Sequence, residues 1–372
     1  MKEGWEYKKF ESCLVKVPKQ VPVKSKDYKK TGRFPIVSQE SELISGYWDD
    51  ETIVYKHNEP VIIFGDHTKN IKYIDFDFVV GADGTHILST KDDIIAKYFF
   101  YALKSVKLRN LGYARHYKLL KEKYIPVPPL SEQQRIVDYL DSAFAKIDAM
   151  KANAEKALNE TKALFQASLK EMLEPKEGWE EKALKDFATD MYRGSGVKRD
   201  QVTEDGIFCV RYGEIYTKYG YHFNECYSHT LAEYVNSPKY FEYGDILFAI
   251  TGESVEEIGK SIAYTGKEKC IAGGDIVVMK HNYEPRYISY ALSTPSAIKQ
   301  KGRGKTKLKV VHTNIPSLKE IVIPIAPKDE QIKIADTLDS LKSKVDRLQA
   351  NYDKISQECD ALKQAILRQV FE

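Results

Sequence analysis

The chain has 372 residues, of which 42% are hydrophobic and 30% charged, and its net charge is +3. This length predicts two or three domains, and the composition excludes a disordered protein. No run approaches eighteen apolar residues and the start lacks the apolar core of a signal peptide, so we expect a cytoplasmic protein without a membrane span.

The first globular segment, residues 1–124, is predicted to have a mixed α/β fold. β-rich runs at 59–65 and 76–80 are bounded by Gly, Asp and Pro, as strands in such folds are. A helical stretch follows around 94–104 and carries Tyr-Ala-Leu at its end.

Residues 125–175 contain a predicted long helix. A Pro-Pro pair precedes Ser131, and Ser131 with Gln134 has the spacing of a capping box, which typically begins a helix. No glycine or proline interrupts the segment from there to residue 173. About 43 helical residues correspond to a length of roughly 64 Å.

The second globular segment, residues 176–322, resembles the first in composition and order. Its start at residues 176–180 repeats the Lys-Glu-Gly-Trp-Glu of residues 2–6. β-rich runs at 245–250 and 275–279 precede a helical stretch at 285–292. We therefore expect a second mixed α/β domain.

The last segment, residues 323–372, is a copy of residues 125–174. The two align without a gap, and 22 of the 50 positions are identical. The chain is therefore built twice, as a globular segment and a long helix followed by a second globular segment and a second long helix.

Both helices carry apolar residues at alternating spacings of four and three, which indicates the seam of a coiled coil. In the second helix the seam residues are Ile334, Leu338, Leu341, Val345, Leu348, Ile355, Leu362 and Ile366. The matching positions of the first helix include Ile136, Leu140, Ile147, Met150 and Leu164. Since the second globular segment follows the end of the first helix at once, the second helix must run back along the first. We expect an antiparallel pair, chain ends that lie close together, and a nearly circular arrangement with a pseudo-twofold axis.

No catalytic or metal motif is complete. Gly259-Lys260-Ser261 resembles the end of a phosphate-binding loop, but Ser254 stands where that loop needs its first glycine. Cys226 and His229 form only half of a zinc pattern, and the five cysteines are never spaced as Cys-x-x-Cys. We therefore predict a non-catalytic protein without a metal site or a disulfide.

Two blocks of basic residues stand just before the two helical segments and are candidate DNA-phosphate contacts. Residues 1–124 carry a charge of +5, whereas residues 125–175 carry −2. The first block contains Arg109, Arg115, His116 and Lys118, and the second contains Lys299, Lys301, Arg303, Lys305, Lys307 and Lys309. A basic run is often only a solvated surface, but its recurrence at the same place in both halves favours contact with phosphates.

The duplicated plan resembles the specificity subunit of type I restriction–modification systems. The resemblance covers essentially the whole chain and rests on PVPPLSEQQRIVDYLD and PIAPKDEQIKIADTLD before the helices, on Trp5 and Trp179 at the segment starts, and on GDILFAITG from residue 244. The second helix start departs from the first, with Pro-Lys-Asp-Glu-Gln in place of Pro-Leu-Ser-Glu-Gln.

This resemblance implies two target-recognition domains, each reading one half of a bipartite site in double-stranded DNA, with the helices as spacers. It also implies two methyltransferase subunits docked on the helices and motor–nuclease subunits that join for cleavage. Adenine methylation and ATP-dependent cleavage, with S-adenosylmethionine, ATP and magnesium, would belong to those partners. This subunit would hold no cofactor.

Two alternatives remain at this stage. The chain could be a coiled-coil adaptor whose globular ends bind proteins, or the specificity component of another multi-subunit methyltransferase system. Salt-dependent binding to duplex DNA separates the first alternative from the resemblance, and the neighbouring genes separate the second.

Overall fold

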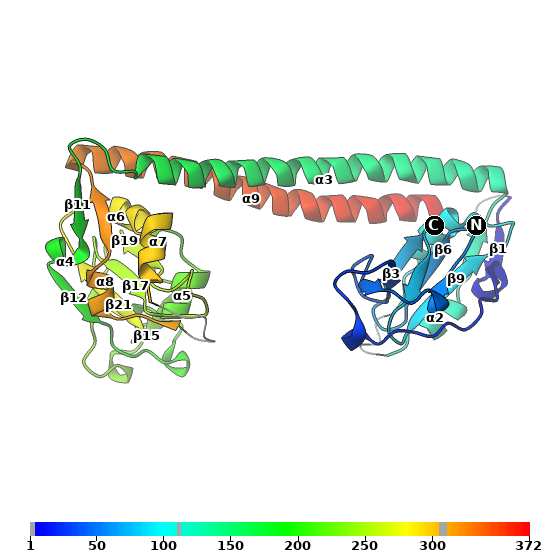
Figure 1. The fold of residues 1–372 in the computed structure, drawn as a ribbon, viewed down its shortest axis with the longest axis horizontal. Helices are drawn as coiled ribbons and strands as arrows, with labels where there is room; N and C mark the ends of the chain where they lie inside the picture. Colours follow the sequence, from blue (N-terminus) through cyan, green and yellow to red (C-terminus); the bar gives the residue numbers. More distant parts are fainter. Residues whose placement is uncertain (1–3, 110–111, 113, 305–310) are drawn as a thin grey trace. The chain divides into compact units, whose positions relative to one another are not determined.

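The computed structural model describes residues 4–109, 112, 114–304 and 311–372 and contains two compact units (Figure 1). Unit 1 comprises residues 1–155 and 351–372, and unit 2 comprises residues 156–350. Two long helices, α3 (Leu130–Met172) and α9 (Lys328–Phe371), each contribute to both units. No described helix is long and apolar enough to cross a bilayer.

The globular region of unit 1 consists of small sheets covered by helix α1 (Ala96–Ser105) and helix α2 (Tyr117–Lys121). One sheet has the strand order β2-β9-β6-β7 and another has the order β4-β3-β8-β5, while β1 pairs with β10. The strands are β1 (Glu6–Lys9), β2 (Leu14–Val15), β3 (Phe34–Val37), β4 (Gly46–Trp48), β5 (Val54–Tyr55), β6 (Val61–Gly65), β7 (Ile71–Ile74), β8 (Phe78–Val80), β9 (Thr85–Thr90) and β10 (Tyr124–Val127). The predicted runs at 59–65 and 76–80 therefore correspond to β6 and β8.

The two ends of the described chain pack into the same core in unit 1. Trp5 contacts a cluster that includes Tyr98 and Leu140, together with Leu367 and Phe371 from the end of α9. The rings of Tyr98 and Phe371 lie 5.5 Å apart between centroids. The prediction that the chain ends lie close together is met within this unit (Figure 1).

The globular region of unit 2 has the same plan with longer insertions. Its larger sheet has the order β12-β21-β17-β19-β14, a second sheet has the order β15-β13-β20-β16, and β11–β23 and β18–β22 form separate pairs. The strands are β11 (Glu180–Ala183), β12 (Asp190–Arg193), β13 (Ile207–Val210), β14 (His222–Phe223), β15 (Ser228–Thr230), β16 (Tyr240–Phe241), β17 (Ile246–Ala249), β18 (Thr251–Gly252), β19 (Ser261–Tyr264), β20 (Cys270–Ala272), β21 (Ile276–Lys280), β22 (Val311–His312) and β23 (Val322–Ile325). The helices are α4 (Leu184–Phe187), α5 (Tyr212–Thr217), α6 (Pro285–Ala291), α7 (Pro295–Lys301) and α8 (Ile315–Lys319).

The repeated segment starts form equivalent strand pairs in the two units. Strand β1 pairs antiparallel with β10, so that Tyr7 lies opposite Pro126. Strand β11 pairs antiparallel with β23, so that Glu181 lies opposite Pro324. Each pair leads directly into a long helix, which explains why the Trp-led start and the Pro-rich segment are repeated together.

The long helices begin slightly earlier than the capping pattern predicted. Ser131 lies within α3 instead of capping it, and the carbonyl oxygen of Pro129 accepts the backbone N–H groups of Glu132 and Gln133 at 2.9 and 3.0 Å. Pro327 has the same role before α9, where it accepts from Glu330 and Gln331. The prolines, rather than the serine, mark the helix starts.

Within each unit α3 and α9 run antiparallel. In unit 1 the partner of Asp148 is Lys363, and one turn further along α3 the partner of Lys151 is Asp360. In unit 2 Lys162 donates a hydrogen bond to Gln349 at 2.7 Å.

The predicted seam applies to only part of the helices. Ile136, Leu140, Ile147, Ile334, Leu338 and Val345 are buried, and Leu341, Leu348, Ile355 and Ile366 are half-buried. The prediction is wrong for Met150, Leu164 and Leu362, which are 59%, 57% and 47% exposed.

The physical reason is the periodicity of an undistorted α-helix. A strict alternation of four and three assumes 3.5 residues per turn, whereas the helix has 3.6, so the apolar face drifts along a long helix. Beyond Ile147 the buried residues of α3 are Leu158, Phe165 and Leu169, one position later than the predicted seam. In α9 the corresponding change follows Cys359, because Leu367, one position after the predicted seam residue Ile366, is buried, whereas Ile366 is only half-buried.

Candidate nucleic-acid interface and its anchors to the helices

The first basic block is divided between surface and interior. Arg109, Arg115 and Lys118 are exposed, and the guanidinium of Arg115 lies 4.0 Å from the carboxylate of Asp66. His116 is fully buried, and its backbone N–H donates to the carbonyl oxygen of Asp66 at 2.8 Å. His116 therefore holds the start of α2 against Asp66, the residue that follows β6. The prediction that His116 contacts phosphate is wrong, because its side chain is buried.

The second basic block is divided in the same way. Lys299 and Arg303 are exposed, whereas Lys301 is only 6% exposed. Helix α7 has one face on the core, and Lys301 lies on that face one turn after the buried Ala297. The prediction that Lys301 contacts phosphate at the surface is therefore wrong. Lys305, Lys307 and Lys309 lie outside the described residues.

Each globular region is fastened to its long helix by a buried glutamine. In unit 1 the side-chain oxygen of Gln133 accepts the N–H of Ile95 at 2.8 Å, and its nitrogen donates to the carbonyl oxygens of Asp93 and Pro128, each at 2.9 Å. Ile95 is the residue before helix α1. Gln133 thus satisfies a backbone donor at the start of α1 that the helix itself leaves unpaired.

The equivalent glutamine makes the equivalent contacts in unit 2. The side-chain oxygen of Gln331 accepts the N–H of Glu284, the residue before α6, at 3.1 Å. Its nitrogen donates to the carbonyl oxygen of Ala326 at 2.7 Å. A buried amide with both ends paired fixes the distance and the rotation of α6 relative to the start of α9.

Two turns along each helix, an aspartate makes the second attachment. In unit 1 the carboxylate of Asp141 accepts from Lys97 at 2.6 Å and from the hydroxyl of Tyr101 at 2.5 Å, both on α1. In unit 2 the carboxylate of Asp339 accepts from Arg286 at 2.7 Å and from the hydroxyl of Tyr290 at 2.6 Å, both on α6. We call Gln133 with Asp141 the unit 1 anchor and Gln331 with Asp339 the unit 2 anchor.

Asp339 has one further partner, because Nε2 of His222 lies 2.8 Å from its carboxylate. Burial raises the pKa of this carboxyl, but hydrogen bonds from His222, Tyr290 and Arg286 outweigh burial and hold the pKa of Asp339 at about 2. Arg286 also bonds Glu284 and Asp336, so the unit 2 anchor is an ionic network rather than one pair. Burial raises the pKa of both Tyr101 and Tyr290, which keeps their hydroxyls protonated as donors.

The anchors were missed in the sequence, although a signal was present. Gln133 and Gln331, and likewise Asp141 and Asp339, are identical between the two repeat copies. Polar residues on a long helix suggest solvent exposure, and only the preserved identity at matching positions indicated a shared structural role.

The comparisons with known proteins agree with this duplicated plan. A family model described as the type I restriction modification DNA specificity domain matches residues 2–160 and again residues 176–357. The chain belongs to this family. The family predicted from the repeat and its motifs is thereby confirmed.

A curated relative and two solved structures are similar to the chain. The specificity subunit of the type I restriction enzyme EcoR124I/EcoR124II from Escherichia coli is 29% identical over 174 residues, a match that spans 43% of this chain and 42% of that protein. The HsdS subunit from Thermoanaerobacter tengcongensis is 17% identical, with a TM-score of 0.53 over 100% of this chain and 97% of that one. A chain from a structure of complex assembly in a type I restriction–modification system is also 17% identical, with a TM-score of 0.68 over 100% and 98%. At this identity the structures show the fold alone, and they confirm the predicted mixed α/β fold with long helices.

Proposed function

We propose that this chain is the DNA specificity subunit of a type I restriction–modification enzyme, in which each globular region reads one half of a bipartite target. The observation that carries the proposal is the double family match along one chain. The repeated anchors support it further, because each of two readers is fixed to a long helix in the same way. A DNA-reading role also implies the cytoplasm as its location.

Exposed basic residues are the proposed phosphate contacts. They are Arg109, Arg115 and Lys118 in unit 1 and Lys299 and Arg303 in unit 2, and Lys305, Lys307 and Lys309 remain in the proposal on their sequence alone. Contacts to phosphates position a protein on DNA without carrying sequence information, so the bases would be read by other residues of the same regions.

The helices have the length that a spacer needs. Helix α3 has 43 residues and α9 has 44, which corresponds to about 65 Å each. Half-sites read from one side of the duplex lie about 34 Å apart for each helical turn. The exposed faces of the helices would dock two methyltransferase subunits, and motor–nuclease subunits would complete the restriction enzyme. Adenine methylation with S-adenosylmethionine and cleavage with ATP and magnesium would be reactions of those partners.

A binding experiment with the assembled methyltransferase tests DNA reading. The variant carries Arg109, Arg115, Lys299 and Arg303 changed to Glu, and the control carries Lys156→Glu, an exposed helix residue outside both blocks. Each DNA phosphate that the variant no longer binds should reduce the slope of log K against log salt by about 0.9, and affinity should fall for all sequences alike. Equal affinity and slope in the variant and the control would remove these residues from the interface.

A domain exchange tests the division of labour. Residues 5–124 are replaced by the equivalent segment of another family member, and the methylated sites are mapped before and after. We expect one half of the recognised site to change and the other half to remain. A change in both halves would contradict independent readers, and an absence of salt-dependent DNA binding would favour the adaptor alternative.

A further inference from the structure

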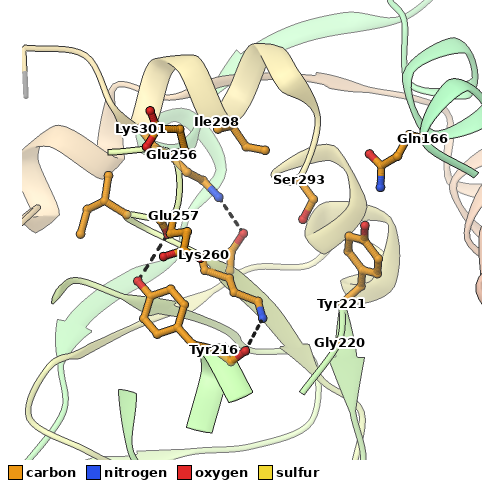
Figure 2. A pocket seen from close by; sticks show the side chains of 12 residues that line it. Gln166, Tyr216, Gly220, Tyr221, Glu256, Glu257, Lys260, Ser293, Ile298 and Lys301 are labelled. Atoms are coloured by element: carbon orange, nitrogen blue, oxygen red, sulfur yellow. Dashed lines mark hydrogen bonds between the residues drawn. The ribbon is translucent and has the colours of Figure 1, made fainter. Parts of the chain in front are cut away.

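Unit 2 contains a cavity that the proposed DNA-reading role does not use. Its volume is about 400 Å³, within the range of small-molecule sites, and Lys260, Ser261, Ser293 and Lys301 contribute polar atoms to its wall. Figure 2 shows Lys301 reaching from α7 toward Lys260, with Tyr221 and Gln166 on the other side of the cavity. Lys260 and Ser261 of the Gly259-Lys260-Ser261 motif therefore line a cavity, although the motif does not form a phosphate-binding loop.

Lys301 is a buried lysine that has no partner of opposite charge among the residues that the structure describes. Its ammonium nitrogen donates to the hydroxyl oxygen of Ser261 at 3.0 Å and lies 5.9 Å from the ring centre of Phe248. Within the part of the chain that the structure describes, no carboxylate lies within ion-pair distance of it. Burial alone lowers the pKa of Lys301 to about 7. An ammonium has three donor hydrogens, so at least two remain available to a ligand.

The path of the Lys301 side chain depends on the glycine of the motif. A Cβ atom placed on Gly259 would lie 3.3 Å from Cδ of Lys301, and Gly259 also has a φ of +72°, which favours glycine. A larger residue here would press on the lysine stem. The motif thus supplies the space through which Lys301 reaches the cavity.

Two further donors face the same space. The ammonium of Lys260 makes long hydrogen bonds, at 3.4 and 3.3 Å, to the carbonyl oxygens of Tyr216 and Tyr219, and burial lowers its pKa. The hydroxyl of Ser261 accepts from Lys301, which leaves its own hydrogen to donate. Glu256 and Glu257 also line the cavity, but both are exposed. The buried part of the wall thus presents Lys301 and Ser261, with the half-buried Lys260 beside them, whereas both glutamates are exposed.

We propose that this cavity binds a small phosphate-bearing molecule, whose phosphate oxygens accept hydrogen bonds from Lys301, Lys260 and Ser261. The phosphate would supply the counter-charge that Lys301 lacks, and charged donors bind phosphate oxygens more strongly than neutral donors do. The site differs from a phosphate-binding loop, because Ser261 begins strand β19 rather than a helix and side chains take the place of the backbone cradle.

Calorimetric titration of the full chain with inorganic phosphate tests the proposal. Lys301→Met removes the charge but keeps an apolar chain of similar length, and Lys299→Met changes the exposed lysine two positions earlier on the same helix as a control. Losing a charged hydrogen bond should weaken phosphate binding about tenfold or more in Lys301→Met and leave it unchanged in Lys299→Met. Ser261→Ala, which leaves both lysines in place, should weaken it less.

Measurements of the melting temperature and of DNA affinity complete the test. Replacing an unpaired buried charge by an apolar side chain should leave the melting temperature unchanged or raise it, so a loss of binding in Lys301→Met would not reflect unfolding. DNA affinity should equal that of the native chain in Lys301→Met, whereas Lys299→Met, which removes a proposed DNA-phosphate contact, should lower it. A loss of DNA affinity in Lys301→Met relative to the native chain would assign the site to a backbone phosphate and overturn the small-molecule proposal. Undetectable phosphate binding, or equal binding in all variants, would also overturn it.

Discussion

Asp339→Ala should loosen the attachment of α6 to α9 far more than Asp336→Ala. Both carboxylates accept from the same Arg286 nitrogen, at 2.7 and 2.8 Å, and both lie on α9. They differ in surroundings, because the side chain of Asp339 is 24% exposed and that of Asp336 is 62% exposed. The pair is therefore a matched test of whether burial and shared hydrogen bonds, rather than the ion pair itself, stabilise the anchor.

The expected magnitude follows from the carboxyl group's own equilibrium. A pKa lowered from 3.8 to about 2 means that the folded state favours the charged carboxylate by about 2 kcal/mol. Leaving the hydroxyl of Tyr290 and a ring nitrogen of His222 unpaired gives a similar cost, about 1–3 kcal/mol. We expect Asp339→Ala to lower the local opening free energy of α6 by about 2–3 kcal/mol. Asp336→Ala should lower it by less than about 0.5 kcal/mol, as is usual for an exposed ion pair.

Hydrogen exchange measured by mass spectrometry on peptides that cover α6 provides the assay. A local opening free energy lower by about 2 kcal/mol accelerates exchange roughly 30-fold. Peptides from β13 and β15, which lie in the other sheet of unit 2, provide an internal reference. If the two variants accelerate exchange of α6 equally, or if Asp339→Ala leaves it unchanged, the anchor does not hold the region in the way we infer.

Three further predictions concern the anchor and the helices. Because the pKa of Asp339 is lowered, the stability that its carboxylate contributes is complete above the unfolded-state pKa near 4 and is lost as the pH falls toward 2. In acid titrations between pH 5 and pH 2, the free energy of unfolding of Asp339→Asn should therefore fall by about 2 kcal/mol less than that of the native chain. Phe165→Ala should lower the free energy of unfolding by about 3–5 kcal/mol in urea titrations, whereas Leu164→Ser should change it by less than about 0.5 kcal/mol. A larger loss of stability in Leu164→Ser than in Phe165→Ala would restore the predicted seam. Four residues are inserted into each long helix at paired levels, near positions 155 and 356, which adds about 6 Å. Methylation by the assembled enzyme should then prefer a gap between half-sites longer by about one to two base pairs, and an unchanged preference would contradict the spacer role.

The large features of the fold could be predicted because the sequence repeats them. The gap-free copy of 50 residues indicated two long helices, and β-rich runs indicated strands that became β6, β8, β17 and β21. Periodicity located the seam near the helix starts at Ile136 and Ile334, where little drift has accumulated. It failed at Met150 and Leu164, because a small error per turn moves the apolar face after several turns.

The polar residues were harder to predict, because their roles depend on contacts distant in sequence. Lys301 and His116 belong to basic runs, yet tertiary packing buries them, and charge alone carries no information on which face of an element meets the core. Asp339 depends on His222, which is 117 positions away. Identity between the repeat copies was the one local signal for such residues, and it was present at Gln133, Gln331, Asp141 and Asp339.

The shared core of unit 1 has a consequence for the order in which the protein folds during its synthesis. Leu367 and Phe371 complete a core whose other residues lie between Phe10 and Leu140. At about 5–20 residues per second, the ribosome needs roughly 10 to 40 s to proceed from residue 155 to residue 371. Unit 2 is one continuous stretch, residues 156–350, and can close without waiting for the last helix turns. The region made first therefore finishes last, and a premature stop near residue 350 would expose apolar surface at the beginning of the chain rather than at its new end.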